Sequence, residues 1–411
     1  MAEFIVLGAG MVGIGAALAL QARGHAVTVL DRSPPGTETS HGNAGVIQAE
    51  AVEPYAIPHD IATLFSYATG RSNDVLWHLR DLPSVAPALW RYFRHSAPAR
   101  HAVLSKGYAP LVLSATADHA PLIAASESEA LIRRTGLGEL YRTARTLDVA
   151  AANAERMRDR YGLGSEVLTG GALAKAEPAL NGPLAGMLLW TDSWSSSDPG
   201  ALTRAYADLF LARGGRVLTG DATSLTETGN GWKVESSEGP VEASDVVVAL
   251  GPWSPDLLAP LGYRIHMIWK RGYHGHFNAP TPLNRPCLDD ANGIVMSSMT
   301  RGLRITTGAE LVGRNAPRTL RQLERGQRAA SELLDLGAPV PDSTWHGHRP
   351  CLPDMLPLVG AAPRHRGLWF DFGHGHQGFT LGPTTGRLLA DIVEGQTDAV
   401  TAALSPALRG I

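Results

Sequence analysis

The feature that constrains this chain most is a glycine-rich turn near its start, Gly8-x-Gly10-x-x-Gly13. The apolar run at residues 4–7 is typical of a fully buried strand, and an apolar helix pattern continues from the turn through Leu20. Gly8 permits a tight strand-to-helix turn, Gly10 lets a pyrophosphate approach the main chain, and Gly13 lets helix and strand pack closely. The helix would then present its N-terminal N–H groups and its positive dipole end to phosphates.

A second strand pattern, residues 26–30, follows this helix and ends at Asp31. At about 20 residues beyond the glycines, a carboxylate can accept the ribose hydroxyl groups of an adenine dinucleotide. Strand, glycines, helix, strand and acid in one βαβ unit therefore predict dinucleotide binding, with a purely structural βαβ unit as the alternative. The unit does not separate FAD from NAD, whereas Asp31 disfavours the 2′-phosphate of NADP by charge repulsion.

The composition describes an ordinary globular chain with ample core. Its 411 residues carry a net charge of −3, with 44% hydrophobic and 18% charged residues, so nucleic acid is not an expected partner. Two cysteines, Cys287 and Cys351, do not form a disulfide framework and suit a reducing compartment. We expect no metal site, no secretory leader and no membrane-spanning helix, because no stretch of about 20 apolar residues occurs. The expected setting is cytoplasmic, and a peripheral contact with the inner face of the membrane stays open.

Residues 39–45, TSHGNAG, place small polar side chains between glycines, where main chain can approach a ligand closely; an ordinary polar loop is the alternative. Here the sequence resembles a known family. Residues 8–32, GAGMVGIGAALALQARGHAVTVLDR, and 39–47, TSHGNAGVI, are similar to the start of the flavoprotein D-amino acid dehydrogenases. These belong to the FAD amine oxidoreductases, with D-amino acid oxidase, glycine oxidase and sarcosine oxidase. The FAD-binding residues implied at this end are Gly8, Gly10, Met11, Val12, Gly13, Asp31, Arg32, Ser40, His41, Asn43, Ala44, Gly45 and Val46.

The middle of the chain resembles the family at a second FAD signature. A Val-rich strand at 245–250 runs into Gly251-Pro252-Trp253-Ser254. Alone it would indicate only a buried strand, but far downstream of a dinucleotide unit it favours FAD over NAD. The resemblance implies FAD contacts at Gly251 and Trp253, and a main-chain contact at Ala222, after a helix at 200–213 that Asp198 is expected to cap.

Two tyrosines are candidates for substrate contact. The stretch around Tyr55 passes near the flavin in the family, and a core or surface aromatic is the alternative. Tyr273, on a strand within 266–277, matches the family's Lys-Gly-Tyr segment, although Arg271 intervenes. It either hydrogen-bonds the substrate or fills the sheet.

The C-terminal stretch resembles the family's carboxy-terminal block. WHGHRP at 345–350 precedes Pro353-Asp354, a glycine-rich loop at 373–378 and a helix at 381–394. The arginine of the family's Gly-x-Arg-Pro segment holds the substrate carboxylate in oxidase relatives, and this arginine falls on Arg349. The planar guanidinium of arginine suits this task. A structural ion pair is the alternative. N–H groups at the start of the helix can stabilise negative charge on the flavin. The residues implied there are Gly375, His376, Gln377, Gly378, Phe379 and Thr380.

Three histidines and a cysteine in this block bear on the chemistry. His374 matches a family position and invites a general-base role, and a metal role is not expected because no carboxylate or cysteine partner is nearby. His348, His376 and Gln377 depart from the family, which puts the substrate rather than the cofactor in doubt. A more polar pocket suits a polar or second-carboxylate side chain, or an N-substituted amine. In some sarcosine-oxidase relatives a cysteine in this region is joined covalently to the flavin, so Cys351 is a candidate for such a link. The local spacing resembles the non-covalent dehydrogenases and favours non-covalent FAD.

We therefore predict an α/β fold in which a Rossmann-like FAD-binding domain (1–58, 198–262 and 340–411) is interleaved with an antiparallel-sheet α+β substrate domain (59–197 and 263–339). The predicted activity is oxidation of the C–N bond of a D-amino acid or related α-amino carboxylate by hydride transfer to flavin N5. The imino acid formed would hydrolyse to a 2-oxo acid. The alternatives are oxidation of a secondary amine (an N-substituted amino acid, opine or D-proline-like imino acid), a non-catalytic flavin- or nucleotide-binding protein, and an NAD-dependent dehydrogenase. The electron acceptor (oxygen, a quinone or a carrier), the stereochemistry and the oligomeric state stay open.

Overall fold

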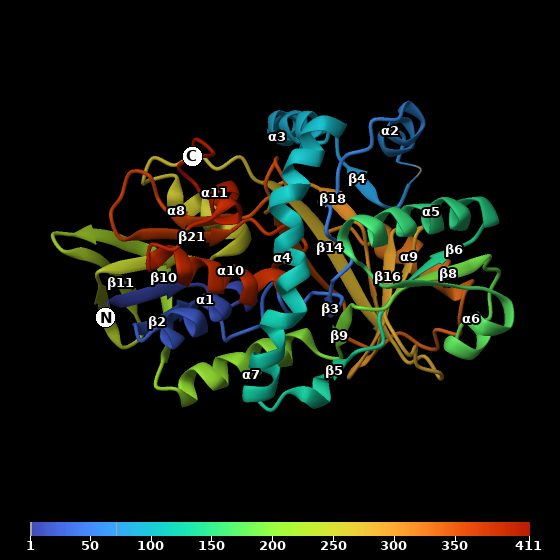
Figure 1. Cartoon of the computed structure of the whole chain (residues 1–411), viewed down its shortest axis with the longest axis horizontal. Coiled ribbons are helices and arrows are strands. Elements are labelled where there is room, and N and C mark those ends of the chain that lie inside the picture. Colours follow the sequence, from blue (N-terminus) through green and yellow to red (C-terminus); the bar gives the residue numbers. More distant parts are fainter. Residues whose placement is uncertain (1, 71) are drawn as a thin grey trace.

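A computed structural model describes residues 2–70 and 72–411. Met1, in the predicted segment 1–58, and Arg71, in the predicted segment 59–197, lie outside the described residues. The fold is mixed α/β, as predicted, with two large sheets side by side (Figure 1). Both ends of the chain lie on the side of the first sheet, and the long helix α4 (Pro98–Ala125) crosses the view between the two sheets.

The first sheet has a parallel centre formed by strands from far-apart segments. β1 (Glu3–Leu7) pairs in parallel with β2 (Ala26–Asp31) on one side and with β13 (Asp245–Val248) on the other, and all four residues 4–7 are buried. Burial on both faces is what parallel strands covered by helices require. In spatial order the described strands are β12 (Gly239–Ala243), β11 (Gly231–Ser236), β10 (Arg216–Thr228), β2 (Ala26–Asp31), β1 (Glu3–Leu7), β13 (Asp245–Val248), β21 (Leu368–Phe372) and β20 (Leu358–Ala361).

Two helices from opposite ends of the chain pack together on this sheet. A Cβ added at Gly15 of α1 (Met11–Ala22) would lie 2.5 Å from the carbonyl oxygen of Gly382 in α10 (Gly378–Val393). Such an approach of two main chains is open only to glycine. It brings the N-terminus of α10 beside the opening turn of the chain, so the two glycine-rich segments meet although about 370 positions separate them.

The second sheet is mainly antiparallel and also takes in a strand from the C-terminal part. β19 (Trp345–Cys351) lies within the predicted FAD-binding segment 340–411, but it pairs along its length with β14 (Ile268–Phe277). The second sheet therefore carries the predicted carboxylate-binding residue, Arg349. Its other described strands, in spatial order apart from β14, are β4 (Val75–Trp77), β18 (Ala309–Leu311), β17 (Gly302–Thr306), β16 (Ile294–Met299), β15 (Cys287–Asp289), β6 (Leu137–Tyr141), β8 (Gly186–Trp190) and β7 (Ser165–Leu168).

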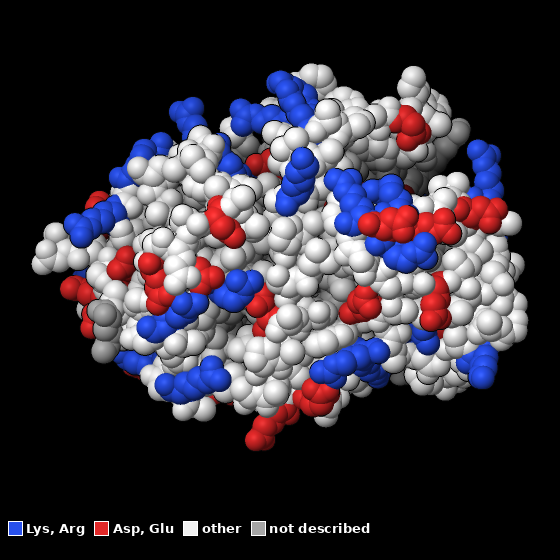
Figure 2. Space-filling view, viewed as in Figure 1, with Lys and Arg blue, Asp and Glu red and all other residues white. Residues whose placement is uncertain are grey.

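The remaining described elements cover the sheets and connect them. α7 (Pro199–Ala212) begins after Asp198, whose carboxylate accepts a hydrogen bond from the Ala201 N–H at 2.8 Å, which confirms the predicted cap. None of the helices in residues 2–70 and 72–411 is both long and apolar enough to cross a membrane. On the face shown in Figure 2, acidic and basic side chains are interspersed, most densely over α5. The elements are α2 (Ile61–Ala68), α3 (Leu82–His95), α5 (Ala144–Tyr161), α6 (Gly170–Ala176), α7 (Pro199–Ala212), α8 (Ser254–Leu258), α9 (Arg321–Ser331), α11 (Ala399–Leu404), the 3₁₀ turns Glu129–Leu131 and Gly251–Trp253, and a small sheet of β3 (Val46–Ile47), β9 (Trp194–Ser196) and β5 (Ile132–Arg133).

Candidate active site

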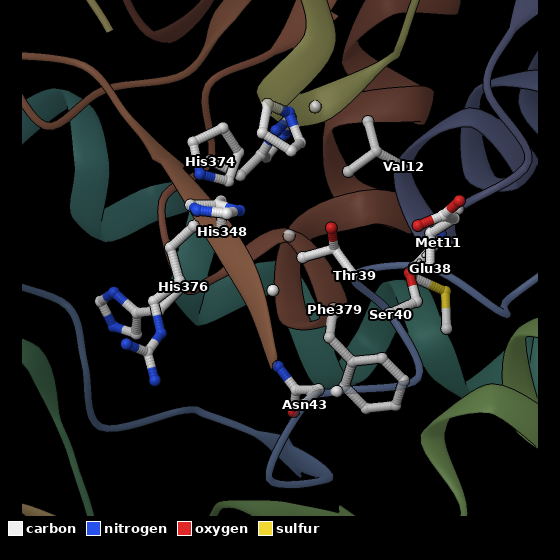
Figure 3. Close-up of a pocket in the computed structure, with 18 of the residues that line it drawn as sticks. Met11, Val12, Glu38, Thr39, Ser40, Asn43, His348, His374, His376 and Phe379 are labelled. Carbon is white, nitrogen blue, oxygen red and sulfur yellow. Dashed lines mark hydrogen bonds between the residues drawn. The ribbon is translucent and has the colours of Figure 1, made fainter. Parts of the chain in front are cut away.

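A cavity of about 420 Å³, the main cavity, is bounded by residues of both large sheets. Figure 3 shows Met11, Ser40 and Glu38 on one side of it and His348, His374 and His376 on the other. Five predicted residues are not among those that bound it: Gly13, His41, Gly45, Gln377 and Thr380. The predicted residues that bound it are Gly8, Gly10, Met11, Val12, Asp31, Arg32, Ser40, Asn43, Ala44, Val46, Tyr55, Ala222, Gly251, Trp253, Tyr273, His348, Arg349, His374, Gly375, His376, Gly378 and Phe379.

The opening turn presents the start of α1 to this cavity. Gly8 has φ +114°, and a Cβ at Gly13 would come within 1.9 Å of the Gly8 carbonyl oxygen, so both positions require glycine. Gly10, the N-cap, offers no capping side chain, and the Met11 N–H donates to Ser40 Oγ at 3.0 Å. At a helix start whose N-cap residue has no side chain, main-chain N–H groups can bind an anionic group.

Asp31 lies where β2 ends and is fixed by the same turn. Its Oδ2 accepts a hydrogen bond from the Ala9 N–H at 2.7 Å, and its Oδ1 accepts one from the Ser33 N–H at 2.9 Å. Burial raises the pKa of Asp31, and the two N–H groups oppose this increase. The carboxylate is thus held at the edge of the cavity, at the position that the spacing predicts for a ribose contact.

Arg32 and Glu38, which follow Asp31 in the chain, form a polar rim on the same side of the main cavity, and the sequence predicts only the first of them. The Arg32 guanidinium lies over the Trp253 ring, 4.3 Å from its centroid, which joins two of the predicted cofactor residues. Glu38 was not predicted, although it accepts hydrogen bonds from Arg32 Nη2 and Ser33 Oγ, both at 3.0 Å, and bounds the cavity. An acid in a polar loop gives no sequence signal, because such residues are usually solvated.

Arg304 of β17 holds the loop that carries the predicted residues 40–46. Its Nη1 donates to the main-chain oxygens of His41, at 2.9 Å, and Asn43, at 2.6 Å. Asn43 in turn accepts a hydrogen bond from the Gly45 N–H at 2.7 Å. Burial and Arg304 lower the pKa of His41. His41 and Gly45 thus shape the loop without bounding the cavity, and no pattern in the sequence indicates the role of Arg304.

The C-terminal loop is fixed to both neighbouring strands. The Gly375 N–H donates to Pro350 O at 2.9 Å, and His374 Nε2 lies 2.9 Å from Thr385 Oγ1 and 3.4 Å from Asp371 Oδ1. Burial lowers the pKa of His374 to about 3 and raises that of Asp371 well above its ordinary value. An imidazole with so low a pKa is a poor general base at neutral pH. This geometry supports a positioning role for His374.

The side chains of Gln377 and Thr380 point to the neighbouring strand β3. Gln377 Nε2 donates to Gln48 Oε1 at 2.7 Å, and Thr380 Oγ1 accepts from the Gln48 N–H at 3.3 Å. Thr380 also donates to Val46 O at 3.3 Å. Both residues therefore connect the start of α10 to the segment 46–48, of which Val46 and Gln48 bound the cavity.

Arg349 lies on β19 with its guanidinium across β14. Its Nη1 donates to Gly308 O at 2.7 Å and its Nη2 to Thr307 O at 2.8 Å. A Cβ at Gly272 would lie 2.8 Å from Nη2, so the absence of a side chain there makes room for the guanidinium. Within the described part of the chain Arg349 has no ion-pair partner, and burial lowers its pKa, although an arginine stays charged. Three of its five N–H groups remain for a ligand.

Strand alternation separates Arg349 from two other predicted residues. Across β14 and β19, Arg271 is paired with His348, and Lys270 with Arg349, so the side chains of these two pairs lie on opposite faces. The Tyr273 hydroxyl donates to Glu310 Oε2 at 2.6 Å and accepts from the Thr319 N–H at 2.9 Å, on the face of Arg271. Of the two interpretations of Tyr273, this geometry supports filling of the sheet. Burial and Arg271 lower the pKa of His348 to about 4.

Tyr55 and His376 stand between the main cavity and a second, smaller one. Their rings meet edge to face with centroids 4.7 Å apart, and 52% of Tyr55 is exposed. The smaller cavity, about 40 Å³ and here called the side cavity, is bounded by both residues and by Lys270, Tyr92, Tyr108 and Cys351 among others. Cys351 bounds the side cavity and is not among the residues that bound the main cavity. No group of three or more potential ligand residues that could hold a metal ion occurs among the described side chains.

This chain resembles known proteins over almost its whole length. Residues 3–392 match the model of the DAO family, described as FAD dependent oxidoreductase. The chain belongs to this family. It is 32% identical over 416 residues to a D-amino acid dehydrogenase of Dechloromonas aromatica (strain RCB), covering 95% of this chain and 97% of that protein. It is 29% identical to a D-amino-acid oxidase of Bradyrhizobium diazoefficiens, covering 98% and 97%. The crystal structure of glycine oxidase from Geobacillus kaustophilus shares the fold, with a TM-score of 0.75, 22% identity and 98% of each chain covered.

The residues of the main cavity fit FAD, the cofactor of this family. The uncapped start of α1 suits a pyrophosphate, and Asp31 at the end of β2 suits a ribose. Each carboxylate oxygen of Asp31 accepts one main-chain N–H and keeps a lone pair for a ribose hydroxyl. The first N–H of α1 is bonded to Ser40 Oγ. The cavity continues from there to the second sheet, where the cation Arg349 lies.

Proposed function

We propose that this FAD-dependent oxidoreductase oxidises the C–N bond of a D-amino acid or a related α-amino carboxylate. The observation that carries the proposal is Arg349, a cation without an acidic partner in the described residues, in the same cavity as the dinucleotide turn. An α-carboxylate offers the charge and the planar geometry that the free N–H groups of Arg349 match. The printed names of the curated relatives, D-amino acid dehydrogenase and D-amino-acid oxidase, support this substrate class.

The protein's own task in this reaction is positioning and electrostatics. Arg349 would hold the carboxylate bidentately while Thr307 O and Gly308 O fix the guanidinium, so that the substrate Cα takes one orientation. FAD, when bound, supplies the two-electron acceptor. The N–H groups at the start of α10 would stabilise negative charge at the flavin edge, because a helix N-terminus carries positive partial charge. The imino acid produced then reacts with water to give a 2-oxo acid and ammonia, or an amine where the nitrogen carries a substituent.

We propose that FAD is held without a covalent bond by the predicted residues that bound the main cavity. The start of α1 would take the pyrophosphate and Asp31 a ribose. Gly13, His41, Gly45, Gln377 and Thr380 would act through packing and hydrogen bonds to that set. The position of Cys351, which bounds the side cavity and not the main one, supports the non-covalent alternative.

The domain division remains our proposal, with 1–58, 198–262 and 340–411 on the FAD side and 59–197 and 263–339 on the substrate side. Within it, β19 is a strand that the FAD-side segment contributes to the second sheet. We also propose a cytoplasmic setting, peripheral at the membrane if the electron acceptor is a quinone; both cysteines are free thiols, which is usual for reducing compartments.

Anaerobic bleaching of the flavin tests the proposed function. The purified holoenzyme is mixed with D-amino acids, their L-enantiomers, N-alkyl amino acids and amines that lack a carboxylate. We expect bleaching by carboxylate-bearing amines, with N-alkyl compounds deciding between the primary and the secondary amine alternatives. Bleaching by amines without a carboxylate would contradict the role of Arg349. A yellow protein that no amine reduces would support the non-catalytic alternative.

A further inference from the structure

Two cations lie side by side on the face of the second sheet that carries Arg349. Lys270 of β14 is the register partner of Arg349 on β19, so their side chains share that face. Like charges directly opposite each other on neighbouring strands destabilise a sheet. The ring of His376 lies within the field of both, because Arg349 and Lys270 each contribute to lowering its pKa after burial itself.

Lys270 has no acidic partner in the described residues. Its Nζ donates to the Tyr92 hydroxyl at 3.0 Å and lies 4.3 Å from the centre of the Tyr92 ring. Burial opposes its charge, but Tyr92 and Cys351 raise its pKa above the ordinary value, so the ammonium form persists. One of its three N–H groups is used, and two remain.

Three other cations on or beside the second sheet are neutralised by acids, whereas Arg304 of β17 is bonded to the main-chain oxygens of His41 and Asn43. Arg271, adjacent to Lys270 and on the opposite face, pairs with Glu310 at 2.7 Å. Arg285 pairs with Glu177 and Arg142 with Asp289, each at 2.7 Å. A buried charge without a counter-charge is costly. Lys270 and Arg349 are half-buried, lie next to each other at the predicted substrate position and have no acidic partner among the described residues, which indicates that a ligand supplies the compensating charge.

The side cavity gives the Lys270 ammonium a space of its own beside the main cavity. It measures about 40 Å³ and shares Tyr55 and His376 with the main cavity. Since about 10–15 Å³ of such space holds one water molecule, a carboxylate group fits there. A molecule whose carboxylate is bound to Arg349 would pass the Tyr55–His376 pair to reach Lys270.

We propose that the substrate is an amino or imino acid with two carboxylates, one bound by Arg349 and the other by Lys270. The second carboxylate belongs to the side chain, as in D-aspartate and D-glutamate, or to the N-substituent, as in N-(carboxymethyl)glycine. This inference rests on the proposed function and narrows its substrate class. Lys270 is then a specificity-determining residue, and Arg349 keeps its role for all substrates.

Matched substrate pairs test this on the wild-type holoenzyme. D-Aspartate is compared with D-asparagine, D-glutamate with D-glutamine, and N-(carboxymethyl)glycine with its mono-amide, by the rate of anaerobic flavin reduction. Each pair differs only in the second negative charge. We expect the acid of at least one pair to have a kcat/KM about 30-fold or more above its amide, which is the scale of a buried charge contact. Equal rates within every pair would overturn the inference while leaving the proposed function in place.

Substitution of Lys270 separates recognition from a general effect on the flavin. Lys270→Met should lower kcat/KM of the preferred acid by about 30-fold or more and that of its amide by less than about 3-fold, and Lys270→Arg should restore part of the difference. Lys175→Met, an exposed lysine on α6, is the control with no effect. An equal loss for acid and amide, together with a changed flavin reduction potential, would overturn the inference in favour of a role toward the cofactor.

A binding measurement covers the case in which the variant does not fold or no amine reduces the flavin. Titration of the wild-type holoenzyme with succinate and with butyrate, followed by the change in the flavin absorbance, needs no turnover. We expect succinate to bind at least about 10-fold more tightly than butyrate, since only succinate can reach both cations. Equal affinities would overturn the inference. If no amine reduces the flavin but succinate is preferred, the proposed function fails and the two-carboxylate site stands.

Discussion

The two halves of this molecule offer a ligand different kinds of contact. The side of the first sheet offers mostly main chain: Gly8, Gly10 and Gly13 shape one helix start, and the loop after β21 leads into another. The side of the second sheet offers ions, the half-buried Arg349 and Lys270 and the buried Arg271–Glu310 pair. Main-chain recognition depends on close approach and tolerates no extra atoms. Ionic recognition depends on which charge is left without a partner.

Alanine at two glycines of the opening turn should separate packing from binding, and we expect here the largest effect. In Gly13→Ala the new Cβ would meet Gly8 O at 1.9 Å, so the turn must move, with a loss of more than about 4 kcal/mol in the free energy of unfolding. In Gly10→Ala the nearest atom is Ser40 Oγ at 3.3 Å, so the flavin-free protein should keep its stability and lose FAD affinity. Thermal melts of flavin-free protein and flavin titrations measure the two. Equal melting losses would contradict the distinct roles of these glycines.

Two arginines on neighbouring strands offer the matching experiment for the second sheet. Arg349→Met should leave flavin content and melting temperature nearly unchanged and lower kcat/KM by about 100- to 1000-fold, because it removes a charge that only the substrate neutralises. Arg271→Met should instead destabilise the fold by about 3–5 kcal/mol, because it removes the guanidinium that pairs with the buried Glu310 carboxylate and leaves His78 as its one remaining basic neighbour among the described residues.

Steady-state kinetics and chemical denaturation of both variants measure this contrast. An Arg349→Met protein that unfolds while its remaining folded fraction keeps full activity would show that Arg349 is structural. An Arg271→Met protein as stable as the wild type would show that burial of an ion pair does not distinguish the two residues.

The difference between the halves also explains what the sequence predicts well. The opening turn, the strand ending at Asp31 and the cap at Asp198 are local patterns, each encoded within a few consecutive residues. The face to which Tyr273 and His348 point depends on the register between β14 and β19, about 75 residues apart. The task of Arg304 depends on where a loop at the other end of the chain lies. No sequence pattern around Tyr273, His348 or Arg304 indicates these contacts, so their partners become visible only in the fold.

The acids of the second sheet make its stability depend on pH. Burial, with a smaller contribution from Glu50, raises the pKa of Glu139 to about 7. The folded state then binds more protons than the unfolded state between the ordinary pKa of Glu139 and pH 7, so stability falls as the pH rises through this range and is level above it. For Glu139 alone, the expected loss in the free energy of unfolding is up to about 3 kcal/mol.

Glu139→Gln should remove this part of the pH dependence. We expect the variant to be more stable than the wild type at pH 8 and similar at pH 4, as measured by denaturant unfolding across that range. A residual slope should persist, because burial also raises the pKa of Glu50. Identical curves for wild type and variant would mean that Glu139 titrates near its ordinary pKa in the folded protein.

Two hydroxyls predicted to bind the cofactor allow the finest comparison, with the smallest expected effects. Ser40 Oγ bounds the main cavity and accepts from the first N–H of α1, whereas Thr380 Oγ1 lies away from the cavity between Val46 O and the Gln48 N–H. Ser40→Ala should weaken FAD binding by about 10-fold, the scale of one hydrogen bond. Thr380→Val, of nearly equal volume, should lower stability by about 1 kcal/mol and change FAD affinity by less than about 2-fold. Flavin titration of both proteins decides: if Thr380→Val weakens FAD binding as much as Ser40→Ala, a side chain outside the cavity contributes as much as one that bounds it. Main-chain approach would then not account for recognition on the first-sheet side.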